Sequence, residues 1–409
     1  MQTSHNEPRT QNALFLLELG SLSLVLWYIL SAIATVYFGA LSKIPGPKLW
    51  AASQIPSQWS VMRGTYHLDL LELHKKYGSP VRIGPNEVAF FTAQSFKDIY
   101  AHRPGHKSFV PDRATHQPPP NGVDHIVCAV DDTVHARHRR LLSWAFTEKA
   151  LKEQEPLIQE YIDLLISRLR EQIQSPANGK VDIKSWFNFV TFDIMGDLVF
   201  GESFNCLTDS VLHPWIGIIF DSIKVVCLIG AANHFPLIKT LLNWLIPKSL
   251  HQKAVDHLDL AAQKVDRRIA LQTERPDVMT FVLRNGMTEK SLESAPEKGN
   301  VLSRAELHSN SKMLIVAGSE TSATLLSGAV YFLGTNPTYL REVTTEVRKF
   351  FISHDQIALS TVTNLPYLNA VIEETFRLYP PLVTGLTRVT PAGGEFVTGA
   401  YIPEKVCDF

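Results

Sequence analysis

Apolar side chains recur at helical spacing along most of the chain. The pattern predicts a helix over 67–77, and prolines or glycines mark the ends of several further helices. Those further helices are expected at 150–175, 184–200, 213–230, 248–272, 303–334, 337–351 and from 366 to the prolines at 380 and 381. Short runs at 81–83, 87–91 and 395–401 predict strands, the first two forming a hairpin. The pattern therefore predicts a mainly α fold with small β-sheets.

The N-terminal part contains a long stretch without charge, from Leu19 to Ser42. As a helix it would measure about 36 Å, enough to cross the hydrocarbon core of a bilayer. The stretch is too long for a signal-peptide core, so we expect a disordered segment 1–18 and an uncleaved transmembrane anchor at 19–42. Pro45-Gly46-Pro47 would stop that helix near the start of a body at 43–409. A polytopic membrane protein is an alternative interpretation.

A second apolar stretch runs from Met313 to Leu340, where Glu320 is the only formal charge. Ser303 and Glu306 precede it as an S-x-x-E capping box, which marks where a helix begins. A carboxylate in an apolar helix is costly unless it is paired or reaches water. A catalytic role is therefore one explanation for a glutamate at position 320 of this helix.

Small residues flank this carboxylate. Ala317 and Gly318 have almost no side chain and would leave a groove on one helix face. Thr321 can hydrogen-bond back to the Ala317 carbonyl and bend the helix. The segment thus predicts a hollow with an acid and a hydroxyl at its edge. Two other interpretations remain, namely small-residue packing with a solvent-reaching Glu320, and a second membrane span, which the surrounding polar residues disfavour.

Charged residues gather at two further places. In the segment from His135 to Arg140, ionisable side chains crowd one turn of an amphipathic helix. They form either a solvated basic face or a clamp for an anionic group, which arginine forks suit well. Glu374 and Arg377 stand at i and i+3 of a later helix and can pair there. The loop expected at 101–125 is long enough to suggest a functional role.

Composition argues against several classes of site. The 39 basic and 40 acidic residues leave a formal net charge of −1, so bulk charge does not indicate a nucleic-acid partner. The four cysteines form no C-x-x-C pair, and the 15 histidines show no H-E-x-x-H spacing. Neither a disulfide framework nor a zinc site is therefore indicated, and a reducing compartment fits best.

Taken in order, these features resemble a cytochrome P450, of the fungal membrane-bound kind that serves secondary metabolism, such as the trichothecene hydroxylases. The resemblance covers essentially the whole chain after residue 12, and its motifs are specific as an ordered set. They are the anchor, Pro45-Gly46-Pro47, His135-x-x-x-Arg139, Ala317-Gly318-x-Glu320-Thr321 and Glu374-x-x-Arg377-x-x-Pro380-Pro381.

This resemblance implies a membrane-anchored haem monooxygenase that inserts one oxygen atom into an apolar small-molecule substrate. Electrons would come from NADPH-cytochrome P450 reductase, and the body would lie on the cytosolic side of the endoplasmic reticulum membrane. By the same resemblance, Glu320 and Thr321 would relay protons to bound dioxygen. Ala317 and Gly318 would form the oxygen groove above the haem.

The resemblance also implies which residues hold the cofactor. Arg139 would bind a haem propionate, and His135 stands where many relatives have a tryptophan with the same task. Arg388 is a further propionate candidate. Glu374 and Arg377 would form a structural ion pair behind the haem.

One part of the family pattern has no match in this sequence. In the family, a cysteine in an F-x-x-G-x-R-x-C-x-G loop binds the haem iron, and no such loop follows Arg377. Cys407 lacks the glycine and aromatic frame of that loop, so we expect no metal ligand in this chain and a P450-like fold without its C-terminal part. The alternative function is therefore a truncated, non-catalytic relative, either a remnant or a membrane interaction protein.

Overall fold

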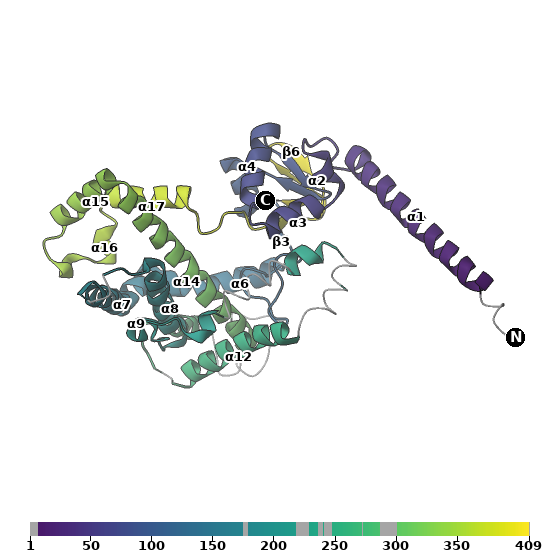
Figure 1. The fold of residues 1–409 in the computed structure, drawn as a ribbon. Coiled ribbons are helices and arrows are strands. Elements are labelled where there is room, and N and C mark those ends of the chain that lie inside the picture. Colours follow the sequence, from purple (N-terminus) through teal and green to yellow (C-terminus); the bar gives the residue numbers. More distant parts are fainter. Residues whose placement is uncertain are drawn as a thin grey trace. The chain divides into compact units, whose positions relative to one another are not determined.

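The computed structural model describes residues 7–174, 179–217, 229–235, 240, 248–271, 273–286 and 301–408. The chain forms two compact units. Unit 1 comprises Met1–Thr115, Gly230–Pro236 and Leu386–Phe409, and unit 2 comprises His116–Ile229 and Leu237–Gly385. Long helices and short strands alternate with loops (Figure 1), which confirms the prediction of a mainly α fold with small β-sheets.

The sheet of unit 1 combines strands from distant parts of the chain. Its order is β1-β2-β7-β4-β3, in which β2 and β7 are parallel and the other neighbours are antiparallel. The strands are β1 (Val81–Gly84), β2 (Glu87–Ala89), β3 (Val110–Pro111), β4 (Arg388–Val389) and β7 (Cys407–Asp408). The predicted hairpin of β1 and β2 is confirmed.

The prediction of a single strand at 395–401 is wrong. Two strands, β5 (Glu395–Val397) and β6 (Ala400–Ile402), pair antiparallel there. Thr398 and Gly399 between them have positive φ angles of 49° and 82°, so the chain reverses direction. A glycine beside a threonine gave no clear turn signal in the sequence, so the reversal was not predicted.

The N-terminal helix α1 extends from Glu7 to Phe38 and therefore differs from the expected anchor at 19–42. Residues 1–6 lie outside the described residues, whereas 7–18, expected to be disordered, are helical. The apolar run that begins before Leu19 continues the helix, and a proline is tolerated in its first turn. The segment Glu18–Phe38 is long and apolar enough to cross a membrane, with a mean hydropathy of 1.9 and none of its most apolar window buried.

Four further helices with defined bounds belong to the described residues of unit 1. They are α2 (Lys48–Ala52), α3 (Ile55–Met62), α4 (Tyr66–Tyr77) and α5 (Ala93–Tyr100). The loop expected over 101–125 contains only β3 as a regular element. The prediction of a helix at 67–77 is thus confirmed by α4.

Unit 2 is helical, and α14 packs most extensively against α8 and α12. The helices are α6 (Asp132–Ser143), α7 (Glu148–Gln174), α8 (Ile183–Phe200), α9 (Cys206–Asp209), α12 (Lys248–Ala270), α13 (Val278–Gly286), α14 (Arg304–Thr335), α15 (Pro337–Phe350), α16 (Leu359–Val362) and α17 (Pro366–Leu378). These bounds confirm most of the helices that periodicity predicts. The helix expected at 213–230 lies largely outside the described residues. Phe192, Trp215 and Ile315 are fully buried in the core around α8 and α14.

Candidate functional site

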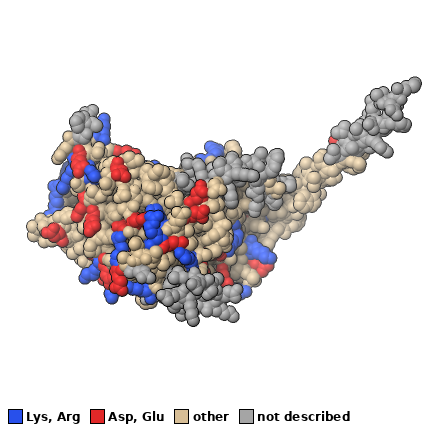
Figure 2. All heavy atoms as spheres, turned by 90° about the horizontal axis from the view of Figure 1, so that it is seen from below, with Lys and Arg blue, Asp and Glu red and all other residues tan. Residues whose placement is uncertain are grey.

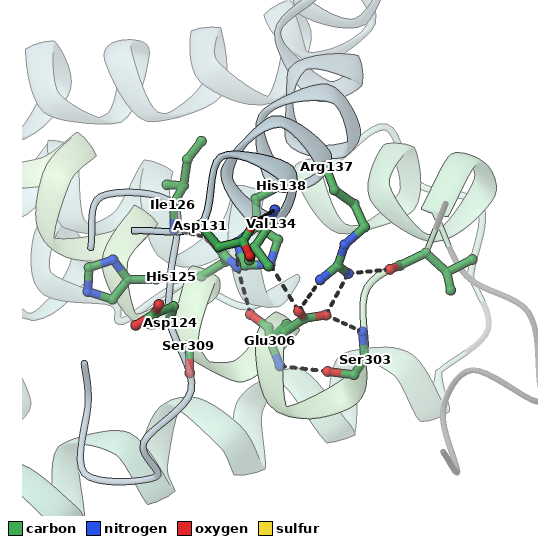
Figure 3. A network of polar contacts seen from close by, with 12 residues as sticks. Asp124, His125, Ile126, Asp131, Val134, Arg137, His138, Ser303, Glu306 and Ser309 are labelled. Carbon is green, nitrogen blue, oxygen red and sulfur yellow. Dashed lines mark hydrogen bonds and ion pairs between the residues drawn. The ribbon is translucent and has the colours of Figure 1, made fainter. Parts of the chain in front are cut away.

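Helix α14 begins with the capping box that the sequence predicts. The Ser303 hydroxyl accepts a hydrogen bond from the Glu306 backbone N–H at 3.2 Å, and the Ser303 N–H donates to Glu306 Oε2 at 2.8 Å. Two of the free N–H donors at the helix N-terminus are thereby satisfied. The capping glutamate also faces α6, where two further side chains bind it (Figure 3).

Arg137 and His138 on α6 complete a network around the Glu306 carboxylate. Arg137 donates to both carboxylate oxygens, at 2.9 and 2.5 Å, and His138 Nε2 lies 3.2 Å from Oε1. Burial alone would raise the pKa of Glu306, but the hydrogen bonds from His138 and Arg137 outweigh it and lower that pKa well below its ordinary value. The network joins α6 to the start of α14 and keeps the carboxylate ionised.

This network divides the basic cluster of residues 135–140. Arg137 is mostly buried and His138 is fully buried against Glu306, whereas Arg139 and Arg140 are exposed. His135 is half-buried and stands one helical turn before Arg139. The cluster is therefore neither wholly a solvated face nor wholly a clamp. Sequence reasoning missed the Arg137–Glu306 pair because 169 residues separate the two side chains.

The centre of α14 places its small residues on different faces. Thr321 Oγ1 donates to the Ala317 carbonyl, as predicted, and Ala317 itself is exposed. Gly318 instead faces α8, because a Cβ atom on it would lie 2.5 Å from Sδ of Met195. The groove predicted from both small residues therefore needs correction, since Ala317 contributes an open face and Gly318 allows close helix packing.

Glu320 is the least satisfied carboxylate on this helix. Its side chain is half-buried, and within the described residues its Oε2 atom is buried without a hydrogen-bond partner. Burial raises the pKa of Glu320, and Lys184 on α8 offsets this only in part. A buried, unpaired oxygen costs free energy, which makes Glu320 a candidate for a functional carboxylate.

The predicted pair on α17 forms. Arg377 Nε donates to Glu374 Oε2 at 2.7 Å, and Arg377 Nη2 donates to Glu374 Oε1 at 2.6 Å. Both side chains are exposed, and their hydrogen bonds lower the pKa of Glu374 and raise that of Arg377. The bidentate geometry fixes their orientation, although such an exposed pair contributes little to stability.

The two remaining sequence candidates, Arg388 and Cys407, both belong to unit 1. Arg388 on β4 stacks over the Tyr100 ring, with 5.5 Å from its Cζ atom to the ring centroid. Burial lowers the pKa of Arg388, and its Nη1 atom is buried without a hydrogen-bond partner among the residues that the structure describes. Cys407 lies in β7, the central strand, where its backbone pairs with both neighbouring strands.

The resemblance implies a haem, and the side chains described above fit this group only in part. The unpaired Nη1 of Arg388 and the exposed guanidinium of Arg139 suit propionate oxygens. The open face of Ala317 and Thr321 suits the side of a porphyrin on which oxygen binds. Among the described residues, however, no cysteine stands in a loop of the family's ligand type.

Comparisons with known proteins agree with these motifs. The family model described as Cytochrome P450 matches residues 44–405. A cytochrome P450 monooxygenase, efuB, of Hormonema carpetanum is 44% identical over 390 residues, which cover 95% of this chain and 75% of that protein. The trichothecene C-15 hydroxylase of Fusarium sporotrichioides is 39% identical, covering 93% of this chain and 75% of its own length. The averantin hydroxylase of Dothistroma septosporum is 37% identical, with 93% and 69% covered. The chain therefore belongs to the cytochrome P450 family and is similar to fungal monooxygenases of secondary metabolism.

Proposed function

We propose that the protein is a haem-dependent monooxygenase that hydroxylates an apolar fungal secondary metabolite. The overall reaction consumes dioxygen, protons and electrons from NADPH delivered by a reductase, and it yields an alcohol and water. The observation that carries the proposal is the centre of α14, where a half-buried carboxylate with one unpaired oxygen stands next to a hydroxyl. The names of the similar proteins support hydroxylation as the reaction.

A haem, when bound, would supply the oxidising chemistry, and the side chains of this chain would supply protons and binding. The raised pKa of Glu320 lets its carboxyl hold a proton closer to neutral pH than an ordinary glutamate does. The hydrogen of Thr321 points to the Ala317 carbonyl, so its oxygen can accept a hydrogen bond from the reacting side. In unit 2, Arg139 and His135 would bind a propionate, and Gly318 would keep α14 tight against α8.

The membrane location belongs to the same proposal. The apolar segment Glu18–Phe38 would hold the protein in the endoplasmic reticulum membrane, with the rest of the chain on the cytosolic side. Acidic and basic residues are interspersed on the face seen in Figure 2, which offers no single-signed patch for a nucleic acid. An apolar substrate that partitions into lipid would reach such an enzyme from the membrane.

A non-catalytic relative that acts as a membrane interaction protein is the alternative. Cys407 itself is not suited to bind a haem iron, because a residue in the central strand of a sheet is not free to approach an iron from a loop. Haem titration of the purified full chain separates the two. A thiolate-type carbon monoxide band would support the monooxygenase, whereas the absence of any haem binding would support the alternative.

A substitution tests the proton role if turnover is obtained. We expect Thr321→Ala to uncouple oxygen consumption from product formation, because the hydroxyl that accepts and passes protons is gone. Ser322→Ala is the matched control, since this neighbouring hydroxyl is exposed on α14. Product and peroxide measured per oxygen consumed give the coupling, and unchanged coupling in Thr321→Ala would exclude this role.

A further inference from the structure

Lys312 lies in the first half of α14, where two other parts of unit 2 meet this helix. One part is α12, because His308 Nε2 on α14 lies 2.7 Å from Asp266 Oδ1 on α12. Lys312 follows His308 by one helical turn and therefore shares its face of α14. The other part is the segment before α6, in which the Ile126 backbone N–H donates to Asn310 Oδ1 at 2.9 Å.

Two histidines beside Lys312 each have one ring nitrogen that already accepts a hydrogen bond. His257 on α12 is 2% exposed, and its Nδ1 accepts from Trp215 Nε1. His125, in the segment before α6, accepts at Nδ1 from the Val127 backbone N–H at 3.3 Å. A neutral imidazole that accepts at one nitrogen carries its proton on the other. Each ring therefore presents an Nε2–H donor, and neither donor has an acceptor among the residues that the structure describes.

Lys312 adds a third donor and the positive charge of this cluster. Its side chain is half-buried and forms no hydrogen bond or ion pair within the described part of the chain. Burial, and next the charge of Lys312, lower the pKa of His125 to about 4 and that of His257 to about 3. Both rings are therefore neutral at pH 7. Their common response to Lys312 also means that the three groups lie near one another, since a Coulombic effect weakens with distance.

The cluster of Lys312, His125 and His257 offers donors but no acceptor to balance them. Asp124, the acid next to His125, accepts from the Cys128 thiol at 3.5 Å and offsets the effect of Lys312 on His125 only in part. Buried donors without acceptors cost free energy. The group that complements this cluster accepts hydrogen bonds only and carries a single negative charge, which describes a carboxylate. A phosphate dianion would exceed the one charge of Lys312.

The donor cluster lies away from the hydroxyl that the proposed oxygen chemistry uses. About two and a half helical turns separate Lys312 from Thr321, so their side chains leave α14 on opposite sides. A ligand at Lys312 would therefore be a second molecule, bound independently of a haem.

We propose that Lys312, His125 and His257 form a binding site for the carboxylate of a small organic acid. The ammonium group and the two Nε2–H groups donate to the carboxylate oxygens. The bound acid joins α12, α14 and the segment before α6, and it thereby stabilises unit 2.

Calorimetric titration of the full chain in lipid nanodiscs at pH 7 tests this site. The probes are benzoate and 2-naphthoate, each compared with its neutral primary amide. We expect both acids to bind more tightly than their amides. In Lys312→Met the dissociation constants of the acids should rise by about tenfold or more, because a charge-assisted hydrogen bond is lost. Lys312→Arg should retain the preference for acids, and Lys149→Met, at a lysine with an 88% exposed side chain on α7, is the matched control.

Three results of the titration would overturn the proposal. They are no binding of either acid, equal binding of acids and amides to the wild type, and equal dissociation constants of the acids for the wild type and Lys312→Met.

Amine labelling of the wild type locates the bound acid without any substitution. Acetic anhydride acetylates accessible lysines, and mass spectrometry of peptides quantifies each site. We expect benzoate to slow the acetylation of Lys312 several-fold and to leave Lys149 unchanged, whereas benzamide should protect neither. Equal protection of both lysines, or no protection of Lys312, would show that benzoate binds elsewhere and would overturn the proposal.

Discussion

Two glutamates on α14 show how one helix can carry opposite environments for the same side chain. Glu306 at its start receives hydrogen bonds from Ser303, Arg137 and His138, and its pKa is lowered. Glu320 at its centre has an unpaired buried oxygen, and its pKa is raised. The first carboxylate holds two helices together, and the second is left available. The same side chain is thus stabilising where it has hydrogen-bond partners and costly where it has none.

The largest change in the free energy of unfolding is expected for a substitution at the start of α14. Glu306→Ala leaves Arg137 and His138 facing a site without a carboxylate, so we expect the free energy of unfolding to fall by about 3–5 kcal/mol. Urea unfolding of the full chain in detergent measures it, with Glu342→Ala, an exposed glutamate on α15, as control.

The pH dependence of Glu306 has a defined sign. Because its folded-state pKa is lowered, its stabilisation is present above its ordinary value of 4.5 and is lost as the pH falls below that value. Equal stability of the wild type and Glu306→Ala at pH 7 would contradict the assignment of this network as the joint between α6 and α14.

A second pair of substitutions compares the packing of two neighbouring small residues on α14. Gly318→Leu forces an isobutyl group into Met195, and we expect a loss of about 1–3 kcal/mol in unfolding free energy. Ala317→Leu adds the same group on the exposed face and should leave stability nearly unchanged. Thermal unfolding of both variants compares them, and similar losses would show that both faces are packed.

The smallest change in the free energy of unfolding is expected for a substitution at the centre of α14, and it is an increase. Glu320→Gln removes a carboxylate whose charged form burial disfavours, so we expect stability at pH 7 to rise by roughly 1 kcal/mol. The raised pKa means that the wild type is relatively more stable at low pH, so the gain should vanish as the pH falls below the ordinary 4.5. A loss of stability in Glu320→Gln at neutral pH would indicate an unseen partner for this carboxylate.

Local signals in the sequence predicted much of this arrangement. The capping box of Ser303, the Thr321–Ala317 hydrogen bond and the Glu374–Arg377 pair all depend on residues within four positions of each other, and all three form. Helical periodicity likewise gave the bounds of most helices. What the sequence did not indicate depends on long-range contacts, such as Glu306 with Arg137 or Gly318 with Met195. These contacts decide which residue of a motif packs and which faces outward.

The central strand of unit 1 has a consequence for how the protein is made. Strand β7 at Cys407–Asp408 inserts between β2 and β4, so the sheet cannot close until the ribosome has passed residue 408. The apolar α1 emerges long before that moment and can be handed to the translocation machinery while β1 and β2 still wait for their partner. In the proposed membrane location, α1 would therefore enter the membrane before the sheet is complete.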